Sequence, residues 1–299
     1  MTAFPQYFAT HSVALLLVSI AVGLIIGSFL NVVIHRLPLM LERRWRADCR
    51  ELIDSLSASG ASIDAAEPAD ERFDLIAPRS RCPHCGHQIS AVENIPVLSF
   101  LWLRGKCSTC GQRISWRYPF VELLCAVLSA VIVWNFGIQT ASVAALLFTW
   151  SLIALSVIDY DRQILPDTIT LPLLWLGLLF NLFDVLVPLR SAVIGAVVGY
   201  LSLWTVYQLF KLLTGKEGMG YGDFKLFAAL GAWLGWQNLF LVILLASFLG
   251  AAVGIVFIVF FGRSRQIPIP FGPFLCFAGW IALLWGDPIT RYYLHIARF

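Results

Sequence analysis

Long apolar segments are the feature that most limits what this chain can fold into. A helix needs about 20 apolar residues to cross the hydrocarbon core of a bilayer. Eight segments qualify, the sixth being short but needed because residues 224–261 are too many for one crossing. The predicted spans are residues 12–34, 119–136, 140–158, 168–187, 191–210, 224–236, 239–261 and 270–286.

The composition supports the same class of protein. Hydrophobic residues make up 59% of the 299 residues and charged residues only 13%, whereas about a quarter of a soluble domain is charged. Residues 1–11 lack the basic region of a cleaved signal peptide, so we expect a retained first membrane helix. The predicted fold is an all-α polytopic membrane protein with about eight transmembrane helices.

The basic residues predict how these helices are oriented. With eight crossings and the N-terminus outside, the inner loops hold 18 of the 21 Lys and Arg residues. This distribution agrees with the positive-inside rule. The three exceptions are Arg190, Arg291 and Arg298.

The spans divide the chain into three predicted parts. Residues 1–35 contain the first transmembrane helix, residues 36–118 form a cytosolic loop domain, and residues 119–299 form a transmembrane domain. Within the loop domain, residues 42–80 show no pattern that fixes a fold. We expect a short helix from Leu41 to Leu56, followed by a flexible linker.

Two acidic tracts lie at the ends of predicted spans. Ile158-Asp159-Tyr160-Asp161 ends the third span, and Gly218-Met219-Gly220-Tyr221-Gly222-Asp223 precedes the sixth. Ionisable groups are costly at membrane depth and therefore indicate a functional site. The predicted topology puts Asp159 and Asp223 on the cytosolic side, where they could form a two-carboxylate acid/base centre.

Each of these aspartates also has a simpler interpretation. A single Asp near a helix end is more often an N-cap or an interfacial charge, and we expect Asp167 to cap a helix that begins at Thr168. Asp161 is expected to be a solvated loop charge. The glycines before Asp223 let the backbone approach a substrate closely, although they would equally suit a flexible hinge.

Two CxxC pairs in the loop domain predict a metal site at residues 82–110. Its candidate ligands are Cys82, Cys85, Cys107 and Cys110. Four thiolates in this spacing are typical of one structural Zn²⁺ ion, because four protein ligands leave no open position for a substrate. Gly86 and Gly111 follow the pairs, where a knuckle turn favours glycine. The alternative is a set of free or redox-active thiols.

Several motifs occur together in one order along the chain. They are Gly27-Ser28-Phe29-Leu30-Asn31-Val32-Val33-Ile34-His35-Arg36-Leu37-Pro38, the two CxxC pairs, Glu93-Asn94-Ile95-Pro96 before Leu103-Arg104-Gly105-Lys106-Cys107, Asp159 six residues before Leu165-Pro166-Asp167, and Gly218-Met219-Gly220-Tyr221-Gly222-Asp223-Phe224-Lys225. With these motifs the chain resembles the type IV prepilin peptidases (prepilin leader peptidase/N-methyltransferases) over nearly its whole length. The last motif is the most specific.

The resemblance implies an intramembrane-type aspartic peptidase with Asp159 and Asp223 as its catalytic pair. It also implies that Gly218, Gly220, Gly222 and Lys225 lie close to the substrate. The substrates of the family are prepilins and pilin-like secretion proteins (pseudopilins), which are cut after a Gly that ends a short basic leader. Many members, commonly those with the cysteine-bearing loop, also methylate the new N-terminal residue with S-adenosylmethionine.

The methyl-transfer site is less defined than the peptidase site. No G-x-G-x-x-G motif follows a strand, so an ordinary Rossmann cofactor fold is not predicted. We place methyl transfer in the cytosolic loop without naming residues that bind the methyl donor. The expected location is the bacterial inner membrane, with the lipid bilayer and pilin substrates as partners. No nucleic-acid partner is expected, and the oligomeric state is left open.

Three alternatives remain at this point. The chain could be a peptidase without methyltransferase activity. It could be a transporter or proton channel, which would place its carboxylates near the membrane midplane. It could also be a non-catalytic assembly protein with a zinc-stapled loop, which would tolerate the loss of Asp159 and Asp223.

Overall fold

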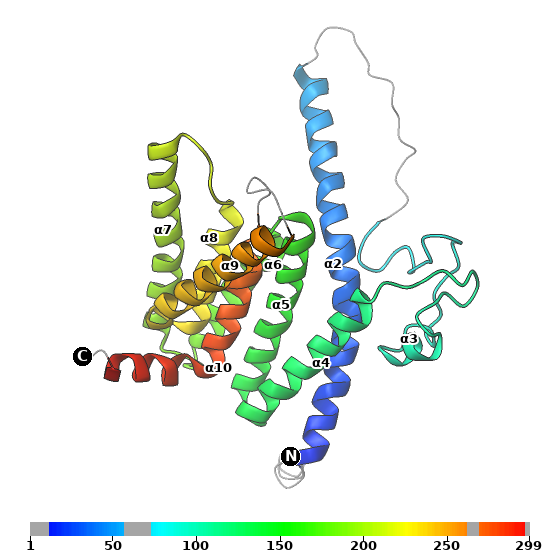
Figure 1. Cartoon of the computed structure of the whole chain (residues 1–299), viewed down its shortest axis with the longest axis horizontal. Coiled ribbons are helices and arrows are strands. Elements are labelled where there is room, and N and C mark those ends of the chain that lie inside the picture. Colours follow the sequence, from blue (N-terminus) through cyan, green and yellow to red (C-terminus); the bar gives the residue numbers. More distant parts are fainter. Residues whose placement is uncertain (1–11, 57–72, 262–268, 297–299) are drawn as a thin grey trace. The chain divides into compact units, whose positions relative to one another are not determined.

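The computed structural model describes residues 12–56, 73–261 and 269–296 (Figure 1). These ranges contain helices, turns and two isolated β-bridges but no strand, so the all-α prediction is confirmed. The helices are α2 (Ser12–Leu56), α3 (Leu98–Trp102), α4 (Arg117–Phe136), α5 (Thr140–Arg162), α6 (Asp167–Asn181), α7 (Leu189–Thr214), α8 (Tyr221–Leu234), α9 (Leu239–Phe261) and α10 (Gly272–Ile296), with a 3₁₀ turn η1 (Trp236–Asn238).

The chain divides into two compact units. The large unit comprises Met1–Ile20 and Val127–Phe299, and the small unit comprises Ala21–Ala126. The small unit contains the CxxC pairs and the large unit contains both acidic tracts.

Eight membrane crossings are not confirmed. Within the described residues, six helices are long and apolar enough to span a membrane: α2, α4, α5, α7, α9 and α10. Helices α6 and α8 have 15 and 14 residues, which corresponds to only about 21–23 Å of the roughly 30 Å hydrocarbon core. The multi-pass character is clear, while two of the predicted spans are short helices.

The fourth predicted span, residues 168–187, ends earlier than expected because of one buried side chain. Helix α6 stops at Asn181. The Asn181 side chain accepts hydrogen bonds from the amides of Leu186 and Val187, both at 3.1 Å, and donates to the carbonyl of Ala232 at 2.9 Å. It therefore holds the chain in a turn after α6 and ties that turn to the end of α8.

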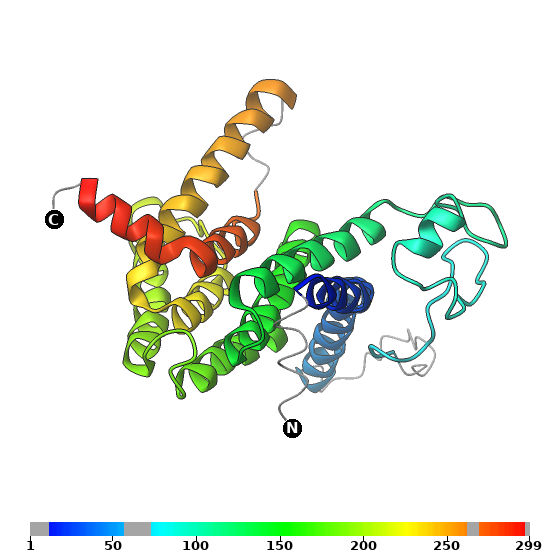
Figure 2. The same cartoon turned by 90° about the horizontal axis from the view of Figure 1, so that it is seen from below.

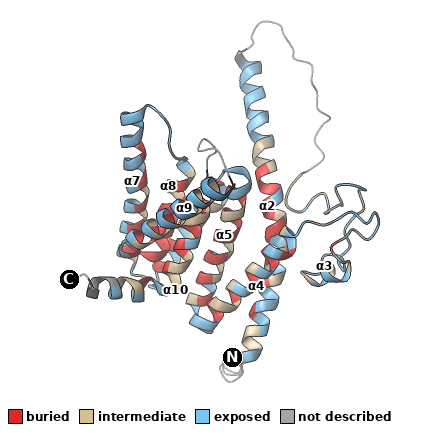
Figure 3. Ribbon diagram, viewed as in Figure 1, coloured by how far each residue is buried: buried red, intermediate tan, exposed pale blue. Residues whose placement is uncertain are grey.

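The first helix also differs from the prediction. A span at 12–34 and a separate helix at Leu41–Leu56 were expected, but α2 is one continuous helix of 45 residues with Pro38 inside it. The residues after Pro38 include many good helix formers, so the helix propagates out of the apolar segment. At about 68 Å, α2 is roughly twice as long as the hydrocarbon core is thick. Its C-terminal half is correspondingly exposed (Figure 3). Residues 57–72 of the predicted linker lie outside the described residues.

Helix α10 bends in its C-terminal part, as both views show (Figures 1 and 2). Pro288 lies within this helix. A proline removes one backbone hydrogen bond and its ring clashes with the carbonyl four residues earlier, which is a usual cause of such a bend.

Helix α8 forms the centre of the large unit, where the buried positions gather (Figure 3). It packs against α6 and α7 with its backbone close to theirs: a Cβ atom at Gly199 of α7 would lie 2.7 Å from the carbonyl oxygen of Phe227. Trp233 is fully buried, donates its indole N–H to the carbonyl of Leu173 at 2.7 Å, and packs against the tilted ring of Phe148. This packing fixes α8, whose first turn contains Asp223.

Candidate functional site

The two predicted catalytic aspartates are both buried and lie near each other. Asp159 lies in the last turns of α5 and is 6% exposed, and Asp223 lies in the first turn of α8 and is 9% exposed. They are close enough for the charge of Asp159 to act on Asp223. Residues 64 positions apart in the chain are thus brought together at the ends of two helices.

A backbone amide from a third segment binds one of these carboxylates. The N–H of Gly272, the first residue of α10, donates to Asp159 Oδ2 at 3.0 Å. The next residue, Pro273, has no N–H, and the amides of Phe274 and Leu275 bond to the carbonyl of Phe271. Among the first residues of α10, the amide of Gly272 is therefore the one directed at Asp159, which satisfies an N–H that has no partner within the helix.

The Leu165 side chain lies beside two glycines, one next to each aspartate in the fold. A Cβ atom at Gly222, next to Asp223, would lie 2.8 Å from Leu165 Cβ, and one at Gly272 would lie 3.3 Å from Leu165 Cδ2. The same Cβ atom at Gly272 would lie 2.6 Å from Asp159 Oδ2. The two glycines therefore leave room for Leu165 and for the Asp159 carboxylate, and larger residues would push the site apart.

The predicted substrate-proximal residues have different environments. Gly218 packs under the ring of Phe210, with 2.8 Å to an added Cβ atom, whereas an added Cβ at Gly220 would meet nothing closer than Asp223 Oδ2 at 4.0 Å. Gly218, Gly220 and Gly222 do not have positive φ angles. Close approach of neighbouring atoms, rather than a left-handed backbone, is what Gly218 and Gly222 provide.

Lys225 is paired with Asp167. Its Nζ atom lies 2.8 and 2.6 Å from the two carboxylate oxygens of Asp167, and the pair links the first turns of α6 and α8. The prediction that Asp167 is an N-cap is wrong. Helix α6 begins at Asp167 itself after Pro166, without a side-chain capping bond, because the ammonium group of Lys225 holds both oxygens. Asp161 lies in the exposed last turn of α5 rather than in a loop.

Two neighbouring carboxylates can perform acid/base chemistry. Both cannot be ionised cheaply at short range, so such a pair holds one proton between its members and titrates as a unit. The ionised member can take a proton from water, and the protonated member can donate a hydrogen bond to a carbonyl oxygen. The burial of Asp159 and Asp223 strengthens both interactions, since less water competes for them.

The four cysteines of the small unit come together as a possible metal site. The sulfur atoms of Cys82, Cys85, Cys107 and Cys110 all lie within 4.8 Å of one another. Two of the distances, Cys82 to Cys110 and Cys85 to Cys107, are 3.8 and 3.9 Å. Four sulfurs that bind a tetrahedral zinc ion at about 2.3 Å lie about 3.8 Å apart, so the donor set and its size fit such an ion.

The two CxxC pairs form the same local structure twice. In the first, the amide of Cys82 bonds to the carbonyl of His87 at 2.8 Å, and the amide of Gly86 to that of Cys82 at 3.0 Å. In the second, Cys107 and Gly111 make the equivalent bonds, also at 2.8 and 3.0 Å. Both glycines have a φ of 70°, which favours glycine over any residue with a Cβ atom.

Backbone amides favour the thiolate form of two of these cysteines. The amides of Cys85 and His84 lower the pKa of Cys82 to about 6. In the second knuckle the amide of Cys110 has the main effect in lowering the pKa of Cys107. The thiolate is the form that binds a metal ion, so the knuckle backbone prepares these ligands.

Glu93 connects the two knuckles from outside. Its carboxylate accepts hydrogen bonds from the Ser108 hydroxyl and from the amide of Ser90, and it lies 3.2 Å from Nε2 of His87. These bonds, that of Ser108 first, lower the pKa of Glu93 to about 2. His87 thus interacts with Glu93 and lies outside the four-cysteine group.

Comparison with known proteins identifies the family. Residues 21–136 match the bacterial peptidase A24 N-terminal domain, and residues 146–255 match the type IV leader peptidase family. The prepilin leader peptidase/N-methyltransferase of Stutzerimonas stutzeri is 55% identical over 98% of both chains. Those of Pseudomonas aeruginosa and Aeromonas salmonicida are 54% and 60% identical over 98% and 91% of both chains.

The chain belongs to the type IV leader peptidase family. No solved structure matches it. The two aspartates and Lys225 lie in the segment that matches the leader peptidase family, and the four cysteines lie in the segment that matches the N-terminal domain.

Three residues around these sites were not found from the sequence. The Gly272 amide binds Asp159, and the Leu165 side chain lies beside Gly222 and Gly272, which only the fold shows. The third is Glu122, a carboxylate inside the apolar segment of α4 that is 8% exposed. The sequence does contain a signal that could have identified Glu122, because a charged residue within an apolar span indicates a functional site.

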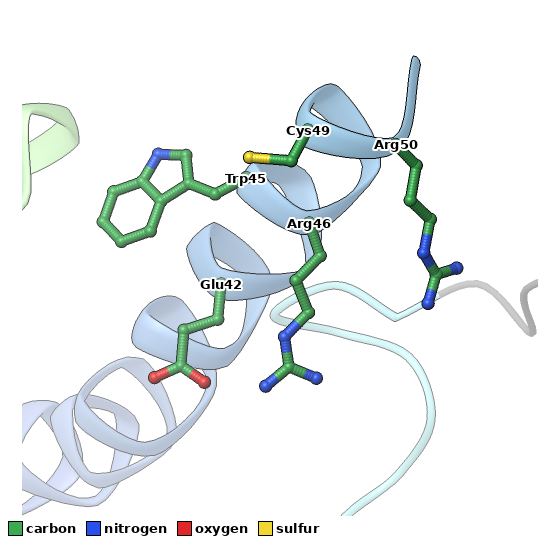
Figure 4. A pocket seen from close by; sticks show the side chains of 5 residues that line it. All are labelled: Glu42, Trp45, Arg46, Cys49 and Arg50. Carbon is green, nitrogen blue, oxygen red and sulfur yellow. The ribbon is translucent and has the colours of Figure 1, made fainter. Parts of the chain in front are cut away.

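A hollow on the surface of the small unit is lined by residues other than the four cysteines. It is lined by side chains on the exposed C-terminal half of α2: Glu42, Trp45, Arg46, Cys49 and Arg50 (Figure 4). All five side chains come from one stretch of this helix (Figure 4).

Proposed function

We propose that this chain is a membrane aspartic endopeptidase that removes the basic leader of type IV prepilins and pseudopilins after a Gly. It also methylates the new N-terminal residue with S-adenosylmethionine. The observation that carries the first activity is the pair of buried, interacting carboxylates, Asp159 and Asp223. The relatives at 54–60% identity, named as prepilin leader peptidase/N-methyltransferases, support both activities.

In the attack step the pair accepts one proton and donates one hydrogen bond, and the accepted proton then passes to the leaving amine nitrogen as the C–N bond breaks. The ionised aspartate takes a proton from the attacking water, and the protonated aspartate donates a hydrogen bond to the scissile carbonyl oxygen. The amide of Gly272 fixes the Asp159 carboxylate during this exchange. A Gly before the scissile bond lets the substrate backbone approach the aspartates. Gly218, Gly220, Gly222 and Lys225 form the adjacent edge of this site.

For the small unit we propose one structural Zn²⁺ ion. Cys82, Cys85, Cys107 and Cys110 would hold it, and all four positions of a tetrahedral ion would then be filled by protein. The sulfur separations support this proposal, as does the backbone that favours thiolates at Cys82 and Cys107. The ion would cross-link the two CxxC pairs and so stabilise residues 82–110.

The proposed location is the bacterial inner membrane with the aspartates and the cysteine knuckles on the cytosolic side. The bias of Lys and Arg toward the inner loops supports this orientation. The division into residues 1–35, 36–118 and 119–299 follows from the same topology. A leader rich in basic residues would stay on that side of the membrane for the same reason.

Replacement of either aspartate tests the peptidase. Asp159→Asn and Asp223→Asn should each lower the rate of prepilin cleavage by about 10²–10⁴-fold, because each removes one acid/base group. Asp161→Asn is the matched control, since this exposed aspartate lies two residues after Asp159 on α5. Purified protein in detergent would be incubated with a prepilin and S-adenosylmethionine, and mass spectrometry would detect cleavage and methylation together.

The outcomes separate the alternatives. Cleavage by either variant at the wild-type rate would contradict the aspartate pair, whereas a wild-type protein that does not cleave prepilin would favour a transporter or an assembly protein. Cleavage without a mass increase of one methyl group would show a peptidase only.

A further inference from the structure

Glu122 is an unusual residue in the small unit. Among the described residues of this unit, only two charged side chains are buried, Glu122 and Arg36, and Glu122 is the only carboxylate of the two. Arg36 is used structurally, since its guanidinium donates to the carbonyls of Asp74 and Pro78 at 2.8 and 2.6 Å. Glu122 lies five residues into α4, about 8 Å from the start of that helix. An ionisable group at this depth of a membrane helix indicates a functional site.

Three segments of the small unit converge on Glu122. Helix α2 approaches its backbone at Gly27, where an added Cβ atom would lie 2.7 Å from Glu122 Cα. The hydroxyl of Ser28 interacts with the carboxylate. The amide of Val97 donates to Glu122 Oε2 at 2.8 Å. The carboxylate therefore sits where two helices and the loop before α3 meet.

The loop that contacts Glu122 is strained. Val97 has a φ of 59°, a left-handed backbone that a β-branched residue rarely adopts. The amide of Leu98 bonds to the carbonyl of Pro96 at 2.6 Å, which closes a tight γ-turn around Val97. Such backbone strain clusters at functional sites. It directs the Val97 amide at the carboxylate.

These bonds leave acceptor capacity on Glu122. An ionised carboxylate has about four lone-pair positions, and Ser28 and Val97 use two of them. An ammonium group has donors to fill the remaining positions and a charge that compensates the buried anion. The ligand that suits the Glu122 carboxylate is therefore a cation with hydrogen-bond donors.

We propose that Glu122 binds the new N-terminal ammonium group of the cleaved pilin and accepts its proton during methyl transfer. The inference rests on the proposed function. An α-ammonium group, with a pKa of about 8, must lose its proton before its nitrogen can attack. Glu122 takes that proton, the nitrogen lone pair forms the N–CH₃ bond, and the S–CH₃ electron pair returns to sulfur. The products are the N-methylammonium group and S-adenosylhomocysteine, and the proton rests on Glu122.

A purely structural role for Glu122 makes a different prediction. If the side chain only anchors the Val97 turn, an amide oxygen would accept the same hydrogen bond, and Glu122→Gln would keep both activities. If it binds and deprotonates the substrate amine, the charge itself is needed. The isosteric variant therefore separates the two roles.

The experiment uses the full-length protein with a pre-cleaved pilin peptide that has a free N-terminus. Glu122→Gln should lower kcat/KM for methylation by about 100-fold or more. Its cleavage of intact prepilin and its metal content should stay within about twofold of wild type. Binding of S-adenosylmethionine, measured by equilibrium dialysis, should also be unchanged. Glu51→Gln, an exposed carboxylate on α2, is the matched control.

Several results would overturn the inference. Methylation by Glu122→Gln at the wild-type rate would contradict it. Weaker binding of S-adenosylmethionine with an unchanged KM for the peptide would also contradict it, because Glu122 would then bind the methyl donor. If the variant does not accumulate, Glu122→Asp takes its place. It keeps the charge but moves it by one methylene, so peptide binding should persist while kcat falls about 10–100-fold. A wild-type kcat would count against a catalytic role. Wild-type protein that cleaves but does not methylate would instead refute the proposed methyltransferase.

Discussion

The cysteine knuckles and the aspartate site differ in how far apart their parts lie in the chain. Cys82 and Cys110 are 28 residues apart, and each knuckle is closed by hydrogen bonds between residues at most five positions apart. Asp159 and the amide that binds it, Gly272, are 113 residues apart. The knuckles depend on turn geometry and on the ligand chemistry of thiolates. The aspartate site depends on how α5, α8 and α10 pack.

The comparison suggests that the two regions respond differently to substitution. In the knuckles, function should depend on the ligands and the glycines, which are visible in the sequence. Around the aspartates, function should depend equally on apolar or small residues that have no chemistry of their own, such as Gly272 and Leu165. Substitutions in the two regions should therefore have effects of different kinds and sizes.

Gly272→Ala should reduce prepilin cleavage by about 100-fold. The added Cβ atom would lie 2.6 Å from Asp159 Oδ2, so the carboxylate must shift, and displacements near 1 Å can cost a factor of this size. Cleavage rates and thermal unfolding would be measured together. Gly279→Ala on the same helix is the control, because the atoms nearest to its added Cβ belong to the buried Leu230 side chain rather than to Asp159. Equal losses in the two variants would point to general damage to α10.

Cys107→Ser should abolish the proposed binding of zinc and lower methylation by about tenfold or more, while cleavage stays within about threefold. A tetrahedral site with a missing thiolate binds zinc poorly, and the aspartates belong to the other compact unit. Metal analysis and the mass spectrometric assay would report the three quantities. Cys49→Ser, at an exposed cysteine outside the cluster, should change none of them. Loss of cleavage together with the metal would show that the units are coupled.

Lys225→Ala and Asp167→Ala should each lower cleavage by up to about fivefold. The pair links α6 to the first turn of α8, but its groups are 30% and 52% exposed, and exposed ion pairs contribute about 0.2–1 kcal/mol. The reversed pair, Asp167→Lys with Lys225→Asp, should recover part of the rate if the pair only positions Asp223. A reversed pair as slow as Lys225→Ala, with a raised KM, would instead indicate that Lys225 contacts the substrate.

Glu93→Gln should have the smallest effect, a modest increase in proteolysis of residues 73–118 in the metal-loaded protein. The pKa of Glu93 is lowered from 4.5 to about 2, so its ionised form stabilises the fold fully above pH 4.5, and this contribution is lost as the pH falls through 2. The difference between variant and wild type should therefore be the same at about pH 8 and pH 9. A difference that grows between these two values would contradict the assignment to Glu93.

Much of this fold could be predicted because membrane spans have a strong sequence pattern. The apolar segments predicted the all-α class and the approximate positions of the helices in the described residues. They failed at helix ends: α2 continues past Pro38, and α6 stops at Asn181. Helix propagation past the apolar segment decides the end of α2, and a side chain that bonds to distant backbone decides the end of α6. A hydropathy pattern contains neither. Asp167 was misjudged for the same reason, since its partner Lys225 lies 58 residues away.

The sequence by itself determined which residues are candidates for chemistry, because carboxylates at membrane depth and paired CxxC motifs are costly or reactive in any fold. Only the tertiary structure decided which groups surround them. The amide of Gly272 at Asp159, Leu165 between two glycines, and the strained Val97 turn at Glu122 all join segments far apart in the chain. Such contacts follow from close packing of helices and loops, which depends on side-chain shape across the whole unit rather than on any local pattern.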